Sequence, residues 1–85
     1  MELKEQFEQA AADSKNLPSK PSNETLLQLY SLYKQGSIGD VNIEPPSNPF
    51  DFVAKAKYDA WAWLKGKSAT EAMTAYIELI TKLKS

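Results

Sequence analysis

The sequence predicts an all-α protein, a small bundle of four helices. Apolar residues recur every three or four positions in four separate segments, and no segment shows a convincing strand pattern. Prolines and glycines fall between these segments, where they favour turns and loops. With 85 residues and a hydrophobic content of 42%, the chain is expected to form one domain over residues 1–85 with one small core.

The first two helices are predicted on either side of a stiff proline-containing connector at residues 18–21. The first is expected to end before Asn16, and Ser22 is expected to cap the start of the second. A break in the second helix is expected at Gly36, a residue type at which chains commonly leave a helix. The apolar positions are Leu3, Phe7, Ala10 and Ala11 in the first helix, and Leu26, Leu29, Tyr30 and Tyr33 in the second.

Residues 36–50 contain five helix breakers and are predicted to be irregular, and a third helix then extends toward Gly66. Trp61 and Trp63 are two positions apart, so they cannot face the same way on this helix. One is expected in the core, and periodicity does not say which. The two candidate stripes are Phe52, Ala56, Ala60, Trp63 and Leu64, or Lys57, Trp61 and Leu64.

The fourth helix has the clearest start signal. Ser68-Ala69-Thr70-Glu71 fits the capping box, in which serine and glutamate satisfy two free backbone donors reciprocally. Its apolar stripe comprises Ala72, Met73, Tyr76, Ile77, Ile80 and Leu83.

Composition and charge exclude several classes of function. The chain has 10 basic and 11 acidic residues, which argues against a nucleic-acid partner. It has no cysteine and no histidine, so disulfides, thiolate zinc sites and cysteine- or histidine-based catalysis are excluded. We expect no catalytic residue, no metal site and no cofactor. The sequence has no apolar run long enough for a signal peptide or a membrane span, so a cytoplasmic location and no stable membrane insertion are expected.

Two short motifs are set aside. Gly66-Lys67-Ser68 is similar to the end of a phosphate-binding loop, but Trp61 stands where that motif needs its first glycine. Asp40, Glu44 and Asp51 do not have the spacing of a calcium loop, so solvated loop charges are the expected interpretation.

Tyr30, Tyr33 and Lys34 stand at i, i+3 and i+4 and therefore share one side of the second helix. With Lys57 and Tyr76, they could bring phenol and ammonium groups from three helices together around a flat base and a phosphate. The alternative is that the tyrosines are half-buried spacers and the lysines are solvated.

Several segments in order resemble the acyl-CoA-binding protein family (diazepam-binding inhibitor-like) over the whole chain. They are Leu29-Tyr30-Ser31-Leu32-Tyr33-Lys34-Gln35, Gly39-Asp40, Lys55-Ala56-Lys57-Tyr58-Asp59-Ala60-Trp61, Leu64-Lys65-Gly66 and Ala75-Tyr76-Ile77. The resemblance implies an up-down-down-up four-helix bundle with a shallow bowl for one long-chain acyl-CoA.

The resemblance also implies roles for individual residues. Tyr30, Lys34 and Lys57 would hold the 3′-phosphate of the CoA ribose, and Tyr33 would pack against the adenine. Tyr76 would line the ligand site, and Lys15 would lie near the pantetheine and acyl path. Weaker ligand-lining candidates are Ala10, Ala11, Leu27, Ser31, Leu32 and Val53.

The function that the resemblance implies is non-enzymatic: an intracellular carrier and pool former for medium- and long-chain acyl-CoA esters. The expected state is a monomer with transient contacts to acyl-CoA-using enzymes or membranes. A helical protein-interaction module without a small-molecule ligand is the alternative, and a thioesterase is more distant. The chain departs from the family at Tyr58, often Trp, at Val53, often basic, at Gly36, often Ala, and at Pro45-Pro46-Ser47, often Arg-Pro-Gly.

Overall fold

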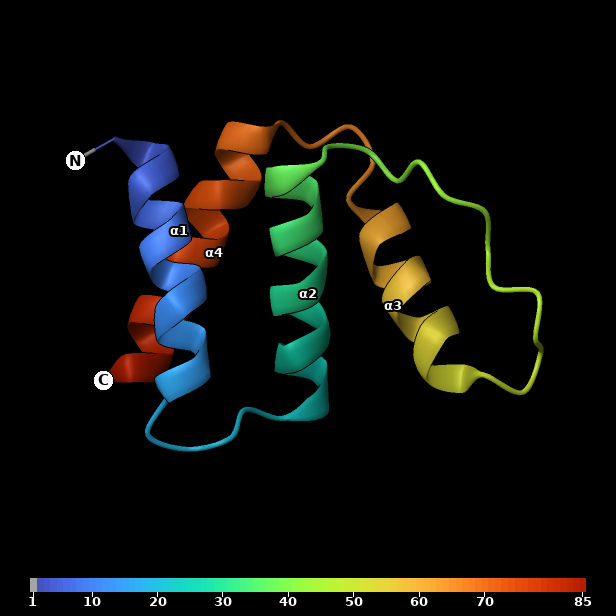
Figure 1. The fold of residues 1–85 in the computed structure, drawn as a ribbon, viewed down its shortest axis with the longest axis horizontal. Helices are drawn as coiled ribbons and strands as arrows, with labels where there is room; N and C mark the ends of the chain where they lie inside the picture. Colours follow the sequence, from blue (N-terminus) through green and yellow to red (C-terminus); the bar gives the residue numbers. More distant parts are fainter. Residues whose placement is uncertain (1) are drawn as a thin grey trace.

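The computed structural model describes residues 2–85, which form four α-helices and no strand within that range. The helices are α1 (Leu3–Asp13), α2 (Asn23–Ser37), α3 (Phe52–Trp63) and α4 (Ala69–Lys84), with a short 3-10 helix η1 (Ser14–Asn16) after α1. Figure 1 shows that α2 and α3 run in the same direction, opposite to α1 and α4. This arrangement confirms the predicted all-α, up-down-down-up bundle.

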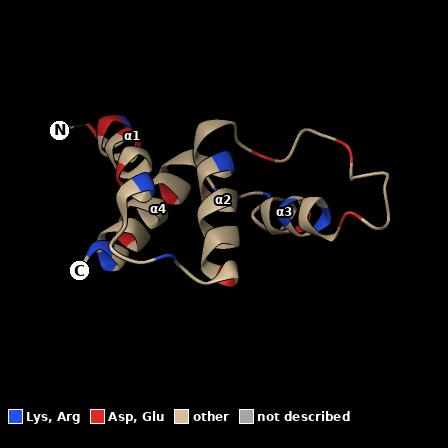
Figure 2. Ribbon diagram, turned by 60° about the horizontal axis from the view of Figure 1, so that its bottom comes forward, with Lys and Arg blue, Asp and Glu red and all other residues tan. Residues whose placement is uncertain are grey.

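Helix α4 is the element that joins the bundle. It packs against both α1 and α2, whereas α1 and α2 make little contact with each other. Helix α3 packs against the other side of α2 and stands apart from α1 (Figures 1 and 2). The bundle is therefore open between α1 and α2. The main buried cluster comprises Phe7, Ala10, Leu29, Tyr76 and Ile80.

Side chains cap the three helices that follow connectors. The Ser22 hydroxyl accepts a hydrogen bond from the Thr25 N–H (3.2 Å), as predicted for the start of α2. At the start of α4, the Ser68 hydroxyl accepts from the Glu71 N–H (3.1 Å), and the Glu71 carboxylate accepts from the Ser68 N–H (3.3 Å). Both caps are confirmed. The Asp51 carboxylate caps α3 by accepting from the Ala54 N–H (3.0 Å).

Gly36 does not end the second helix, so that prediction is wrong. Helix α2 continues through it to Ser37, and the irregular connection begins after that residue. A Cβ on Gly36 would lie 3.1 Å from both Met73 Cγ and Phe7 Cζ. The glycine is needed for close packing of α2 against its neighbours. The chain turns at Gly39 instead, whose φ of 104° suits a residue without a side chain.

Trp61, rather than Trp63, is the tryptophan of the core. The Trp61 side chain is 2% exposed, and its indole N–H donates to the Gly39 carbonyl at 2.9 Å. Trp63 is 87% exposed and Phe52 is 72% exposed. Helix α3 therefore packs with the stripe that contains Lys57 and Trp61, and the stripe with more large apolar residues faces outward. The helix ends at Trp63, before Gly66, whose φ of 94° lies in the following turn.

A polar clasp fixes the end of α2 to the turn between α3 and α4. The fully buried Gln35 side chain donates to the Asp40 carboxylate and to the Lys67 carbonyl, both at 2.8 Å. The same Asp40 oxygen accepts from the Gly66 N–H at 2.9 Å. The hydrogen bond from Gly66, and after it the one from Gln35, lower the pKa of Asp40. The clasp sets the position of α3 beside α2.

Candidate ligand-binding site

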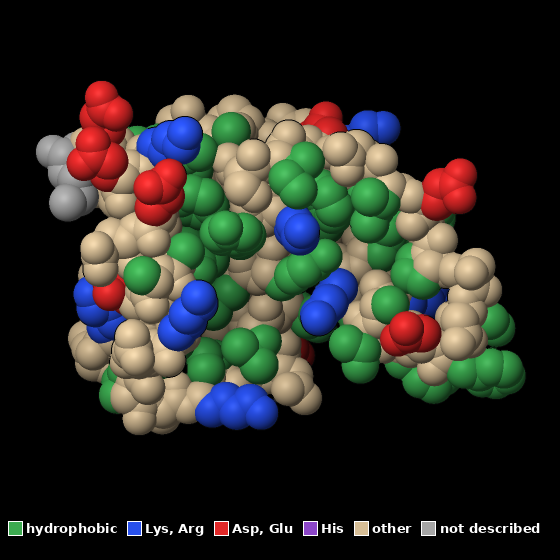
Figure 3. Space-filling model, in the orientation of Figure 1, with side chains coloured by type: hydrophobic (Ala, Val, Ile, Leu, Met, Phe, Trp, Pro, Cys, Tyr) green, Lys and Arg blue, Asp and Glu red, His purple; other side chains and the backbone are tan. Residues whose placement is uncertain are grey.

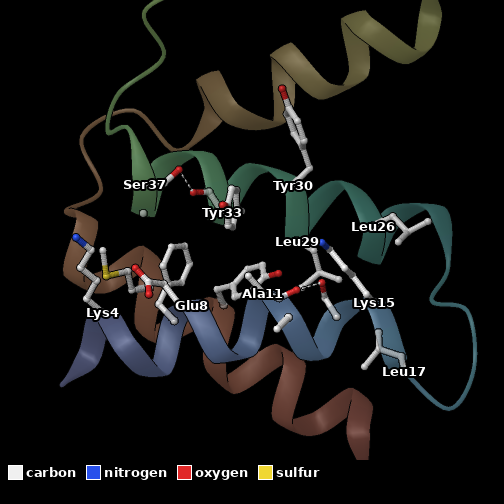
Figure 4. A pocket seen from close by; sticks show the side chains of 16 residues that line it. Lys4, Glu8, Ala11, Lys15, Leu17, Leu26, Leu29, Tyr30, Tyr33 and Ser37 are labelled. Carbon is white, nitrogen blue, oxygen red and sulfur yellow. Dashed lines mark hydrogen bonds between the residues drawn. The ribbon is translucent and has the colours of Figure 1, made fainter. Parts of the chain in front are cut away.

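A cleft of about 950 Å³ opens between α1 and α2, with α4 as its floor. Figure 4 shows side chains from α1 and α2 directed into this space, with Lys15 extending from η1, directly after α1, toward α2. The space-filling view shows apolar side chains gathered on the same face, with lysines among them (Figure 3). The cleft thus combines an apolar lining with positive charge.

Three aromatic rings lie together in the wall of the cleft. The rings of Phe7 and Tyr33 are stacked, with centroids 5.3 Å apart and planes inclined by 25°, and Tyr76 meets Phe7 edge-on at 5.2 Å. Tyr76 is buried, whereas Tyr33 remains 42% exposed beside the cleft. Tyr33 therefore presents a supported flat surface on which another planar group can stack.

The Tyr76 phenol is a neutral group of the cleft wall. Burial raises the pKa of Tyr76, and a side-chain hydrogen bond with Ser14 opposes this shift. The hydroxyl consequently keeps its proton near neutral pH and is available for hydrogen bonding without carrying charge.

Tyr30, Lys34 and Lys57 form a basic cluster between α2 and α3. Lys34 follows Tyr30 by one helical turn, and its Nζ lies 5.8 Å from the Tyr30 ring centroid. The Lys57 Nζ, from α3, lies 5.5 Å from the same ring. Figure 4 shows the Tyr30 side chain extending from α2 toward α3. The sequence left open whether these groups from different helices meet, and the structure brings these three together.

Neither ammonium of the basic cluster has a carboxylate partner. Within residues 2–85, the one salt bridge joins Lys84, at the end of α4, to Asp13, at the end of α1, at 3.0 Å. The Lys34 ammonium lies over two aromatic rings, since its Nζ is also 5.8 Å from the Trp61 ring. Two positive charges held by rings and left unpaired form an arrangement that favours a multiply charged anion.

A second groove, of about 370 Å³, lies between the first turns of α2 and α3. Leu26 lines both this groove and the main cleft, and Lys57 lines the groove and belongs to the basic cluster. The remaining wall is almost entirely apolar, and Leu27 and Val53 are part of it. The cleft, the basic cluster and the groove are therefore neighbours around α2.

The other predicted site residues fall into two groups, those that line the main cleft and those that do not. Lys15 and Ala11 line the main cleft, in keeping with their predicted place beside a ligand. Ala10 is buried in the core, Leu32 packs against that core, and the buried Ser31 hydroxyl donates to the Gln28 carbonyl at 3.0 Å. These three offer little surface to a ligand. Successive side chains on a helix point about 100° apart, so the direct neighbours of residues that line the cleft face elsewhere. Ligand contact remains a prediction for the whole set.

Sequence reasoning did not assign Phe7, Gly36 and Met73 to the site, although all three line the main cleft. Phe7 lies one turn before Ala11, and Gly36 lies one turn after Tyr33, so helical spacing from an assigned residue was the available signal. Met73 lies one turn before Tyr76 on α4, so the same spacing signal was available for it.

Comparison with known proteins gives consistent matches over nearly the whole chain. The family model described as "Acyl CoA binding protein" matches residues 4–80. The acyl-CoA-binding protein of Gossypium hirsutum is 47% identical over 83 residues, which cover 98% of this chain and 92% of the relative. The acyl-CoA-binding domain-containing protein 1 of Oryza sativa subsp. japonica is 48% identical over 83 residues, covering 98% and 90%.

Solved structures give the same result. The crystal structure of Oryza sativa acyl-CoA-binding protein 2 superposes with a TM-score of 0.89 at 43% identity, covering 96% of this chain and 90% of that one. The structure from Moniliophthora perniciosa gives a TM-score of 0.88 at 36% identity, covering 98% and 80%. With a family match over most of its length and relatives near half identity, this chain belongs to the acyl-CoA-binding protein family.

Proposed function

We propose that this protein binds one acyl-CoA ester across the cleft, the basic cluster and the groove. The observation that carries the proposal is the pair of ammoniums without carboxylate partners, Lys34 and Lys57, which lie 5.8 and 5.5 Å from the centroid of the Tyr30 ring, next to an aromatic cleft. Family membership supports acyl-CoA as the ligand. The CoA head group supplies both of the chemistries that such a site favours, a phosphate dianion and a planar base.

Each part of the ligand has a matching surface. The 3′-phosphate would bind Lys34, Lys57 and the Tyr30 hydroxyl, and the adenine would stack on Tyr33. The pantetheine would pass Tyr76 and Lys15 along the cleft. Leu26, which joins the cleft to the second groove, gives the acyl tail an apolar continuation beside Leu27 and Val53.

The head group and the acyl tail are expected to contribute differently to the free energy of binding. An aromatic ring stacked on a base is worth about 1–3 kcal/mol, and a charged hydrogen bond about 1.5–3 kcal/mol. Burying an acyl chain at about 0.8 kcal/mol per methylene provides on the order of 10 kcal/mol before ordering costs. The tail therefore supplies much of the affinity, and the phosphate and base contacts supply specificity for CoA esters.

The protein would act as a carrier that returns its ligand unchanged. The sequence has neither histidine nor cysteine, the residue types most used as general bases and activated nucleophiles. Residues 2–85 contain no cluster of three metal-ligating side chains, and none of the described helices is long and apolar enough to cross a membrane. We propose a monomeric, non-enzymatic acyl-CoA carrier and pool former of the cytoplasm.

Calorimetric titration with palmitoyl-CoA, free CoA and free palmitate tests this function. We expect tight, saturable binding of the ester with one site per protein, weaker binding of CoA, and no comparable binding of palmitate. Absence of ester binding would refute the carrier and favour a helical protein-interaction module. Release of palmitate on long incubation would instead show hydrolysis.

A further inference from the structure

A cluster of exposed apolar side chains marks the outer side of α3 and the residue that leads into it. Phe50, Phe52, Val53 and Trp63 are 80%, 72%, 65% and 87% exposed; we refer to these four as the α3 patch. Figure 3 shows apolar side chains gathered near the start of α3, at the lower right of that view. Large apolar side chains that remain in water forgo the free energy of burial, so four of them on α3 and just before it indicate an interaction surface.

The α3 patch is oriented for contact with a flat surface. Phe52 and Trp63 are about three helical turns apart and share one face, which places them about 16 Å from each other along the helix axis. Trp61 points the opposite way, into the core, and fixes this orientation. A helix that presents apolar groups at both ends of one face can lie flat along a partner, with its axis parallel to the surface.

The charges around the patch identify the chemistry of that partner. Residues 50–67 carry four lysines and two aspartates, a net charge of +2, whereas the remaining residues carry six lysines and nine acidic groups, a net charge of −3. Figure 2 shows lysines on α3 and a concentration of acidic residues at the N-terminal end of α1. Exposed Trp and Phe beside lysines are typical of helices that lie at the interface of anionic lipid membranes.

One aspartate limits how deeply the helix can enter a bilayer. Asp59 is exposed and lies four positions before Trp63, on the side of α3 that carries the patch. A carboxylate is costly to bury in hydrocarbon, so contact would remain at the level of the head groups. This favours weak and reversible docking over insertion.

We propose that the α3 patch docks the protein reversibly on an anionic lipid surface. Phe52 and Val53 belong both to the patch and to the wall of the second groove, so a docked α3 holds that groove against the lipid. An acyl tail could then pass between bilayer and groove without crossing water. That last step rests on the proposed carrier function, whereas docking itself is a property of the ligand-free protein.

Vesicle flotation of the ligand-free protein tests the docking. We expect binding to phosphatidylcholine vesicles that contain phosphatidylserine, weaker binding without phosphatidylserine, and loss of binding at high salt. The double variant Phe50→Ser/Trp63→Ser should lower the partition coefficient by about tenfold or more. The matched control is Ile38→Ser/Ile43→Ser, which removes two exposed apolar side chains outside the patch and should leave partitioning unchanged.

Charge is tested separately with Lys55→Glu/Lys65→Glu, which should also weaken docking, against Lys82→Glu on α4 as the control. Docking is refuted if the wild type does not float with anionic vesicles, or if the patch variant floats equally well. Concentration-dependent dimerisation that only the patch variant abolishes would assign the surface to a second copy and also overturn the proposal. Palmitoyl-CoA titration without vesicles tests carriage independently, and the Phe50→Ser/Trp63→Ser variant should retain wild-type affinity there.

Discussion

Replacing Lys57 with alanine isolates one half of the proposed phosphate site. The Lys57 side chain is exposed on α3, so its truncation leaves the core intact. Its ammonium lies 5.5 Å from the Tyr30 ring centroid, and the Lys34 ammonium lies 5.8 Å from the same centroid. The variant therefore removes one of two positive charges that share a ring, without exposing an unpaired carboxylate elsewhere.

The magnitude follows from the surroundings of the ammonium. Two unit charges about 4 Å apart interact by about 1 kcal/mol in water and about 4 kcal/mol near a protein surface. A hydrogen bond to a charged group contributes about 1.5–3 kcal/mol net. Because Lys57 is exposed, we expect Lys57→Ala to weaken palmitoyl-CoA binding by about 1–3 kcal/mol, or about 5- to 150-fold in Kd. Lys34 is half-buried, so Lys34→Ala should fall toward the upper end of that range.

Isothermal titration calorimetry measures this effect, with circular dichroism to confirm that the fold is retained. Lys82→Ala is the matched control, since it removes the same charge from an exposed position on α4 outside the cluster. The reasoning fails if Lys57→Ala binds like the wild type. It also fails if Lys82→Ala loses as much affinity, because the effect would then come from net charge rather than from a local site.

Three further predictions concern the fold. Trp61→Ala should lower the free energy of unfolding by about 3–5 kcal/mol, and Trp63→Ala should change it by less than about 0.5 kcal/mol, as measured by urea unfolding. Similar losses in the two variants would contradict the finding that Trp61 is buried and Trp63 is exposed. Ser68→Ala removes the hydroxyl of the capping box and should cost about 1 kcal/mol in the same assay, whereas no loss would show that the box does not stabilise α4. The hydrogen bonds from Gly66 and Gln35 lower the pKa of Asp40 below its ordinary value of 3.8, so its stabilising contribution is complete above that pH and is lost as the pH falls through the lowered pKa. Urea unfolding of the wild type across the acid range should show this loss of stability. An equally steep loss in Asp40→Asn would refute the assignment.

Local signals in the sequence predicted the helices well. Helical periodicity located all four, and the caps at Ser22 and Ser68 use hydrogen bonds between residues three positions apart. Contacts of that range are encoded in adjacent residues, so no knowledge of the packing was needed.

Packing between distant segments accounts for the errors. Gly36 was expected to end α2 because glycine often ends helices, yet the close approach of Phe7 and Met73 explains its presence within the helix. Periodicity likewise could not choose between Trp61 and Trp63, since the choice depends on the bond from Trp61 to Gly39, 22 positions earlier.

In the candidate site too, the sequence predicted the local features but not those that depend on packing between helices. The Tyr30–Lys34 spacing was visible on one helix, but the approach of Lys57 depends on how α3 packs against α2. The clasp of Gln35 and Asp40, which positions these two helices, joins the end of α2 to residues about 30 positions later and left no local pattern. The exposed α3 patch also became evident only once the buried side of that helix was known.

The central claim is that the ammoniums around Tyr30 recognise the 3′-phosphate of an acyl-CoA ester. The most direct test compares palmitoyl-CoA with its 3′-dephospho analogue on the wild type and on Lys34→Ala by calorimetry. We predict that removal of the phosphate weakens binding to the wild type by at least about tenfold and has a much smaller effect on Lys34→Ala. Equal losses in the two proteins, or no loss in the wild type, would contradict the claim.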